Sequence, residues 1–133
     1  MPSRKPIYKK EYESVDNVDE SVWFSNDTPI MESDFTFVFE DRYPCVKGHR
    51  LFIPKENNSH FVGRSYGMAY DYGNEQIKKG KIDGFNVGMN IGLCAGQTIM
   101  WPHIHFIPRH KNDSPTIGGI RHAHPSGDHT KYY

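Results

Sequence analysis

Residues 96–109 combine an apolar run with two histidines spaced two positions apart, in the order Gly-Gln-Thr-Ile-Met-Trp-Pro-His-Ile-His-Phe-Ile-Pro-Arg. Side chains at positions i and i+2 of a β-strand lie on the same face of that strand. If this segment is a strand, the imidazoles of His103 and His105 point in the same direction from a rigid element. No other segment of the sequence restricts the fold and its chemistry as closely.

The spacing of His103 and His105 leaves three interpretations open. The pair could be half of a metal site, two ordinary partly buried histidines, or part of a catalytic centre. A metal site would need ligands from elsewhere in the chain, because the residues after His105, Phe-Ile-Pro-Arg-His-Lys-Asn-Asp, include no glutamate.

The pattern of apolar and turn-forming residues predicts four strands and one helix. The strands are expected at residues 35–39, 50–53, 85–90 and 102–108, and the helix within residues 60–80. Pro108 is expected to end the last strand, because proline cannot donate to a ladder. Gly63, Gly67 and Gly73 each weaken the helix by up to about 1 kcal/mol relative to alanine.

A chain of 133 residues is long enough for one domain with a buried core. We expect that domain at residues 22–110, with a polar N-terminal arm at 1–21 and a tail rich in histidine, glycine and proline at 111–133. The histidines at and beyond the end of the domain match no compact zinc motif, so a solvated surface tail is favoured over a metal site. They are His110, His122, His124 and His129.

The 16 basic and 16 acidic residues balance, so no net field favours a nucleic acid or an anionic membrane as partner. No apolar run approaches the ~20 residues of a membrane span, and the N-terminus lacks the apolar core of a signal peptide. We therefore expect a cytoplasmic protein. Cys45 and Cys94 stand alone in strand-like segments and are expected to be buried free thiols.

The segment 96–109 resembles the histidine triad (HIT) family of nucleotide hydrolases and transferases, in which three histidines alternate with apolar residues after Gly-Gln-Ser/Thr. In a register without gaps, Trp101 occupies the first histidine position, His103 the second and His105 the third. Further resemblance lies in residues 37–55, 83–92 and 118–121. The motif style is similar to the bacterial and fragile-type dinucleoside polyphosphate hydrolase branch of the family.

This resemblance implies an α+β fold, with an antiparallel sheet of about five strands and one main helix. It also implies a homodimer and a nucleotide substrate, with a purine base expected, and it requires no cofactor or metal. In related enzymes the second histidine attacks the α-phosphate, and water then hydrolyses the nucleotidyl-histidine. His103 takes the role of this nucleophile by position, and His105 would donate to a phosphate oxygen.

The resemblance assigns further residues to the site. His49 and Gln97 join the two histidines as catalytic residues, since they match positions near the phosphates and the leaving group. The positions matched to nucleotide binding are Phe39, Asp41, Asn90, Gly96 and Thr98. Without the family, Asp41 would be a turn residue beside Pro44. Phe39, like Trp23 and Phe24, would be a core aromatic.

Trp101 is the main departure from the family pattern. An indole offers one N–H donor and neither an acceptor nor a titratable group, so proton handling and the orientation of nearby histidines are expected to suffer. Pro102 also makes the strand irregular there, or places it at an edge. The sequence therefore predicts a working but slow or redirected enzyme. The alternatives are a nucleotide-binding module with weakened catalysis and, less favoured, a metal protein that uses His103 and His105.

Overall fold

The computed structural model describes residues 13–113 and 118–127 and has five strands. They are β1 (Met31–Glu32), β2 (Thr36–Glu40), β3 (Arg50–Pro54), β4 (Gly84–Gly88) and β5 (Ile104–Arg109). All neighbours pair antiparallel, in the order β1-β2-β3-β5-β4. The expected α+β fold, an antiparallel sheet with one main helix, is confirmed.

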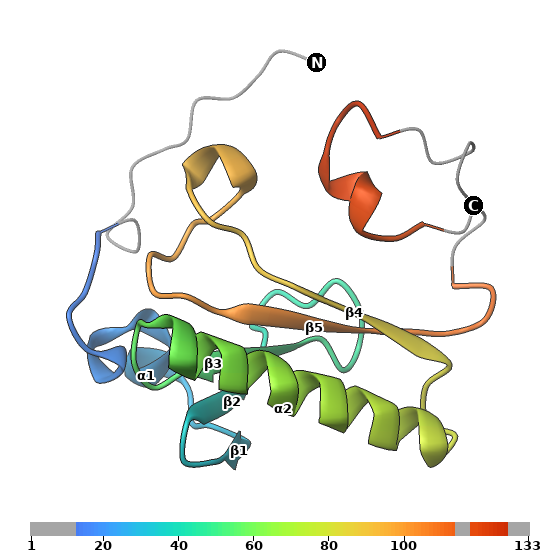
Figure 1. The fold of residues 1–133 in the computed structure, drawn as a ribbon, viewed down its shortest axis with the longest axis horizontal. Helices are drawn as coiled ribbons and strands as arrows, with labels where there is room; N and C mark the ends of the chain where they lie inside the picture. The colour runs from blue at the N-terminus through green and yellow to red at the C-terminus, as the bar shows by residue number, and fades with distance from the viewer. Residues whose placement is uncertain (1–12, 114–117, 128–133) are drawn as a thin grey trace.

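The main helix α2 (Ser59–Lys78) covers one face of the sheet, and shorter elements lie on the other side (Figure 1). The short helix α1 (Val22–Asn26) was not predicted, because five residues are too few to show a period. The described residues also contain three short 3₁₀-helices: η2 (Val18–Glu20), η3 (Leu93–Ala95) and η4 (Ile120–Ala123). None of the helices in the described residues has the length and apolar character needed to cross a bilayer.

Alternating side chains divide the core between the two faces of the sheet. Val38, Phe52 and Phe106 are buried against α2, together with Ala69 of that helix. On the opposite face, α1 covers a second cluster that we call the indole cluster. Its buried members are Trp23, Phe39, Leu51, Ile53 and Trp101.

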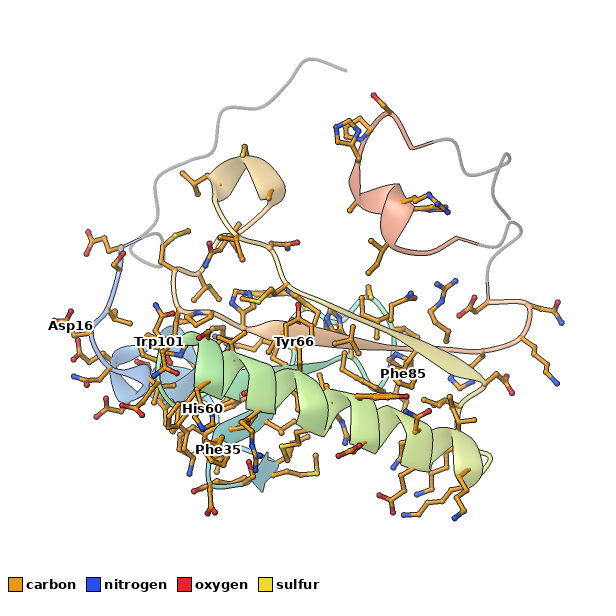
Figure 2. The ribbon with its side chains drawn as sticks, in the orientation of Figure 1. Asp16, Phe35, His60, Tyr66, Phe85 and Trp101 are labelled. Atoms are coloured by element: carbon orange, nitrogen blue, oxygen red, sulfur yellow. The ribbon has the colours of Figure 1, made fainter. Side chains whose placement is uncertain are left out.

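α2 begins at a side-chain cap and continues through all three of its glycines. The side chain of Asn58 accepts a hydrogen bond from the amide of Phe61 at 3.0 Å. Gly73 is buried where α2 meets β4, and the ring of Phe85 fills the space that a side chain there would occupy (Figure 2). This glycine thus allows the close approach of the helix to the sheet, at some cost in helix propensity.

Pro108 does not end the last strand, contrary to the prediction. β5 continues to Arg109, whose carbonyl accepts from the amide of Asp83 on the β4 side. Alternate residues of a strand direct their backbone groups to opposite neighbours, so the nitrogen of Pro108 faces β3. The β3 ladder has already ended at the pair Arg50–Phe106, and no donor is needed there.

The expected burial of the two cysteines is also wrong, since Cys45 and Cys94 are both exposed. Cys45 lies in the turn before β3 and Cys94 lies in η3, not in strands. Apolar neighbours in the sequence therefore did not indicate a buried position for either side chain.

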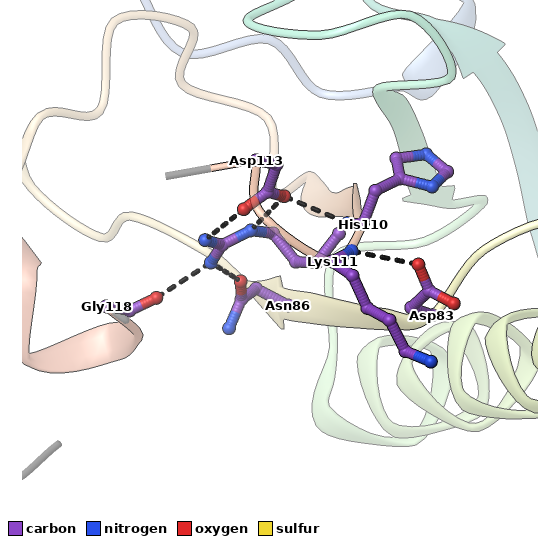
Figure 3. A network of polar contacts seen from close by, with 7 residues as sticks. Asp83, Asn86, His110, Lys111, Asp113 and Gly118 are labelled. Carbon is purple, nitrogen blue, oxygen red and sulfur yellow. Dashed lines mark hydrogen bonds and ion pairs between the residues drawn. The ribbon is translucent and has the colours of Figure 1, made fainter. Parts of the chain in front are cut away.

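The C-terminal residues 118–127 are tied to the sheet through Arg109 (Figure 3). Its guanidinium donates to the carboxylate of Asp113 at 2.9 and 3.0 Å, to Oδ1 of Asn86 at 2.9 Å and to the carbonyl of Gly118 at 2.7 Å. The described part of the predicted tail is therefore exposed but anchored. His129, like residues 1–12 of the arm, lies outside the described residues.

Replacing Gly73 by alanine is expected to destabilise the fold, whereas the same change at Gly67 is expected to stabilise it. A Cβ at Gly73 would lie 2.4 Å from the Phe85 ring, and overpacking of this kind costs about 1–3 kcal/mol. A Cβ at Gly67 would meet nothing within 4 Å, so alanine should add up to about 1 kcal/mol through its helix propensity. Urea denaturation measures both changes. Equal unfolding free energies for the two variants would contradict the packing of Phe85 on Gly73.

Candidate functional site

Three histidines and one aspartate converge on the sheet face opposite α2. His105 lies on β5 and His103 directly before it, while His49 directly precedes β3 and Asp41 directly follows β2. Because β2, β3 and β5 are neighbours in the sheet, these positions meet although they are far apart in the sequence. The ring centroids of His103 and His105 are 5.2 Å apart, as are those of His49 and His105.

His103 is buried and has one nitrogen engaged. Its Nδ1 lies 2.8 Å from the carbonyl oxygen of Trp101, which can only accept, so Nδ1 carries the proton. The lone pair is then on Nε2. Trp23 packs edge-on against the ring at a centroid distance of 5.0 Å. Burial lowers the pKa of His103, although the Trp101 carbonyl and Asp41 act in the opposite direction. The result is a neutral imidazole with a fixed tautomer and its lone pair on Nε2.

The tautomer of His49 is set by a backbone amide. The N–H of Cys45 donates to Nδ1 of His49 at 3.2 Å, so the proton of this neutral ring is on Nε2. That Nε2 lies 2.9 Å from Nδ1 of His105 and 3.2 Å from Oδ2 of Asp41. His105 consequently accepts at Nδ1 and carries its own proton on Nε2. The chain of contacts leaves His105 with a donor for a ligand.

Burial keeps the other two histidines uncharged as well. The pKa of His105 falls to about 4, first because of burial and then because of His103 and His49, with Asp41 acting against the shift. Burial also lowers the pKa of His49, and the negative charge of Asp41 opposes this. At neutral pH the site is therefore three neutral imidazoles beside one carboxylate.

Asp41 fits both interpretations that the sequence left open. Its Oδ1 accepts from the amide of Tyr43 at 2.8 Å, as in a turn. Its Oδ2 faces His49 and, at 3.8 Å, Nδ1 of His105. The carboxylate therefore shapes the turn after β2 and also belongs to the histidine cluster.

The loop before β5 carries four of the predicted residues besides His103. Gln97 is buried, accepts from the amide of Gly92 at 2.8 Å and donates to the carbonyl of Ile99 at 3.0 Å. Its side chain thus braces the loop. Gly96 has a φ of +93° and lies beside the amide of Asn90, while Thr98 is exposed.

Phe39 lies away from the solvent-facing part of the site. Its ring is fully buried in the indole cluster and packs edge-on against the ring of Phe24, with 5.2 Å between the ring centroids. The assignment of Phe39 to a base pocket remains a prediction.

A cavity of about 500 Å³ opens beside His49 and His105, between the sheet and residues 119–123, and His103 is not among the residues that line it. Its polar lining residues are Cys45, His49, Asn86, Asn90 and His105, and the remaining wall is mainly apolar. Among the described residues that line it, none is lysine or arginine. The apolar lining comes from Val87, Met89, Ile107, Ile120 and Ala123.

The residues that could bind a metal ion differ from the pair that the sequence suggested, His103 and His105. Potential ligand atoms of Asp41, His49 and His105 lie within 4.8 Å of one another, and His103 is not among them. The hydrogen bond from Cys45 to Nδ1 of His49 opposes this use, because it leaves the proton on the nitrogen that would bind the metal. The geometry is that of a hydrogen-bonded histidine cluster. The role of Cys45 could not be found from side-chain patterns, since the amide of almost any residue could provide it.

Comparison with known proteins finds a match to the HIT domain over residues 25–112. An uncharacterized HIT-like protein of Methanocaldococcus jannaschii is 30% identical over 94 residues, which cover 66% of this chain and 73% of that protein.

Two other relatives have names that state an activity. An adenylylsulfatase of Arabidopsis thaliana is 33% identical over 91 residues, covering 63% of this chain and 46% of the plant protein. An adenosine 5'-monophosphoramidase of Saccharomyces cerevisiae is 30% identical over 93 residues, which cover 68% of this chain and 59% of the yeast protein. The chain therefore spans only part of either enzyme.

Solved structures show the same fold. A zinc-bound histidine triad family protein of Mycobacterium smegmatis superposes with a TM-score of 0.60 at 26% identity, covering 70% of this chain and 75% of that one. A protein of Streptococcus mutans gives a TM-score of 0.62 at 24% identity, and the match covers 89% of this chain and 81% of that one.

The free energy of unfolding is expected to fall as the pH drops from 6.5 toward 4. The unfolded chain binds a proton at His105 near the ordinary pKa of 6.5, whereas the folded chain binds it only near 4. At pH 5 this difference removes roughly 2 kcal/mol of stability relative to pH 7.5. Denaturation of wild type and His105→Asn at several pH values measures it.

The variant His105→Asn should show the flatter pH dependence, and His110→Asn, which removes an exposed histidine just beyond β5, should resemble wild type. An equally steep loss of stability in His105→Asn would show that His105 is not held neutral by the fold.

Proposed function

The chain belongs to the histidine triad (HIT) family, and on that basis we propose that it is a nucleotide hydrolase or nucleotidyl transferase whose nucleophile is His103. The substrate is a nucleoside polyphosphate or a nucleoside phosphoramidate, attacked at its α-phosphate. The hydrogen bond between Nδ1 of His103 and the carbonyl of Trp101 is the observation that best supports this proposal.

That hydrogen bond suits both halves of a covalent mechanism. Before attack it keeps the lone pair of His103 on Nε2, and burial keeps the ring neutral. After attack the phosphorylated ring carries a positive charge, which the Trp101 carbonyl stabilises through the same contact.

In the first step Nε2 of His103 forms a bond to the α-phosphorus, and the bond from phosphorus to the leaving group breaks. The leaving group departs with that electron pair and takes a proton from water. In the second step a water molecule attacks phosphorus and loses a proton to solvent. The electron pair of the P–N bond returns to His103, and the nucleoside monophosphate is released.

His105 is proposed to stabilise the charge that develops on the phosphate. Its Nε2 carries the proton and can donate it to a ligand, because Nδ1 accepts from His49. A well-placed donor of this kind contributes about 3–4 kcal/mol to transition-state stabilisation. His49 and Asp41 then act by holding His105 in the donating tautomer.

The remaining family positions complete the proposal. Gln97 would brace the phosphate loop, and the groups around the nucleotide would be Phe39, Asp41, Asn90, Gly96 and Thr98. A purine base is supported by the two relatives whose names refer to adenosine 5'-phosphate derivatives. A homodimer is proposed from the family resemblance, and a cytoplasmic location and a domain at residues 22–110, flanked by an arm and a tail, are proposed from the sequence.

The cavity beside His49 and His105 has a mainly apolar lining. A nucleoside phosphoramidate and a dinucleoside polyphosphate are both candidate substrates.

Intact-protein mass spectrometry after short incubation with an adenosine phosphoramidate, and separately with a dinucleoside polyphosphate, tests this function. We expect an added adenylyl mass on wild type and on His110→Asn, no adduct on His103→Asn, and at least a thousandfold slower AMP release from that variant.

Other results would each reject the enzyme proposed here. AMP-dependent thermal stabilisation without turnover would identify a nucleotide-binding module with lapsed catalysis. Activity that a chelator abolishes and zinc restores would indicate a metal-dependent protein built on Asp41, His49 and His105.

A further inference from the structure

Trp101 occupies the first histidine position of the family pattern. Its side chain is held by burial and by one hydrogen bond. The indole is 3% exposed and lies in the indole cluster. Its Nε1–H donates to the carbonyl of Pro54 at 2.9 Å. Pro54 is the last residue of β3, so this bond ties residue 101 to a strand 47 positions away in the chain.

The backbone of Trp101 lies outside the β-ladders of the sheet. Pairing of β5 with β3 begins only at Ile104, and pairing with β4 begins only at His105. Within the described residues, no backbone ladder reaches Trp101, and Pro102 has no N–H to contribute. The indole anchor and the fixed φ of Pro102 therefore determine where the peptide group of residue 101 lies.

That peptide group is the one that orients the proposed nucleophile. The carbonyl of Trp101 accepts from Nδ1 of His103, so a shift of this carbonyl would release the tautomer and the ring orientation. The contacts thus form a continuous connection from the carbonyl of Pro54, through the indole and backbone of Trp101, to the ring of His103.

We propose that Trp101 is a positioning residue, whose indole N–H fixes the carbonyl that holds His103 in its nucleophilic tautomer. The proposal rests on the function assigned above to His103. It departs from the expectation that the tryptophan weakens catalysis. Within this chain an imidazole at position 101 would leave part of the indole space empty and loosen the carbonyl, so Trp101→His should be slower than wild type.

The variant Trp101→Phe removes the N–H donor while keeping an aromatic ring. Phe52→Leu is the matched control, because it removes aromatic volume from the core on the α2 face, away from His103. Nitrogen-15 NMR of the imidazoles reports which ring nitrogen of His103 carries the proton. Rapid mixing with an adenosine phosphoramidate at several concentrations gives the rate of adduct formation and the dissociation constant of the substrate.

In wild type we expect one His103 tautomer, protonated at Nδ1. In Trp101→Phe we expect both tautomers and a roughly tenfold slower adduct formation, with the dissociation constant of the substrate unchanged, since one hydrogen bond is lost. Phe52→Leu should be less stable than wild type and yet keep the single tautomer and the wild-type rate.

A single Nδ1–H tautomer in Trp101→Phe, or a Trp101→His variant faster than wild type, would overturn the positioning role. The NMR measurement separates this proposal from the enzymatic one. If wild type forms no adduct, the proposed function fails, while a tautomer mixture in Trp101→Phe alone would still support the role of the indole.

Discussion

The pairing of β5 between β3 and β4 brings the histidines of the candidate site together. It sets His105 opposite Leu51 on one side and Gly88 on the other. His49 then falls at the start of β3 beside His105, and the turn after β2 brings Asp41 to the same point. A slip of one residue in this register would turn His105 toward α2 and the aromatic core, so the hydrophobic packing also protects the chemistry.

Main-chain groups at both ends of the site decide which nitrogens carry protons. The amide of Cys45 can only donate and the carbonyl of Trp101 can only accept, and between them they fix the tautomers of His49 and His103. His105 then has a single arrangement left to it. Burial adds the second condition, since it lowers the pKa of all three histidines and keeps the rings neutral near pH 7.

Periodicity and strand geometry could predict four of the strands, the main helix and the proximity of His103 to His105, and the family resemblance implied the antiparallel sheet of about five strands. The sequence could not predict the strand that runs through Pro108, since this depends on β3 having ended before Pro108 needs a partner. Nor could it predict that Gly73 is required by the ring of Phe85, or that Cys45 is exposed, because both depend on packing between distant segments. The anchoring of Trp101 to Pro54 belongs to the same class of contact.

Because a backbone amide orients His49, this part of the site depends little on which side chain occupies position 45. The hydrogen bond from residue 45 depends on the peptide group and the turn before β3, and the thiol of Cys45 takes no part in it. Among the ordinary amino acids, only proline lacks the N–H that this bond requires. Position 45 can therefore vary widely among descendants of this sequence while the protonation pattern of the site is inherited unchanged.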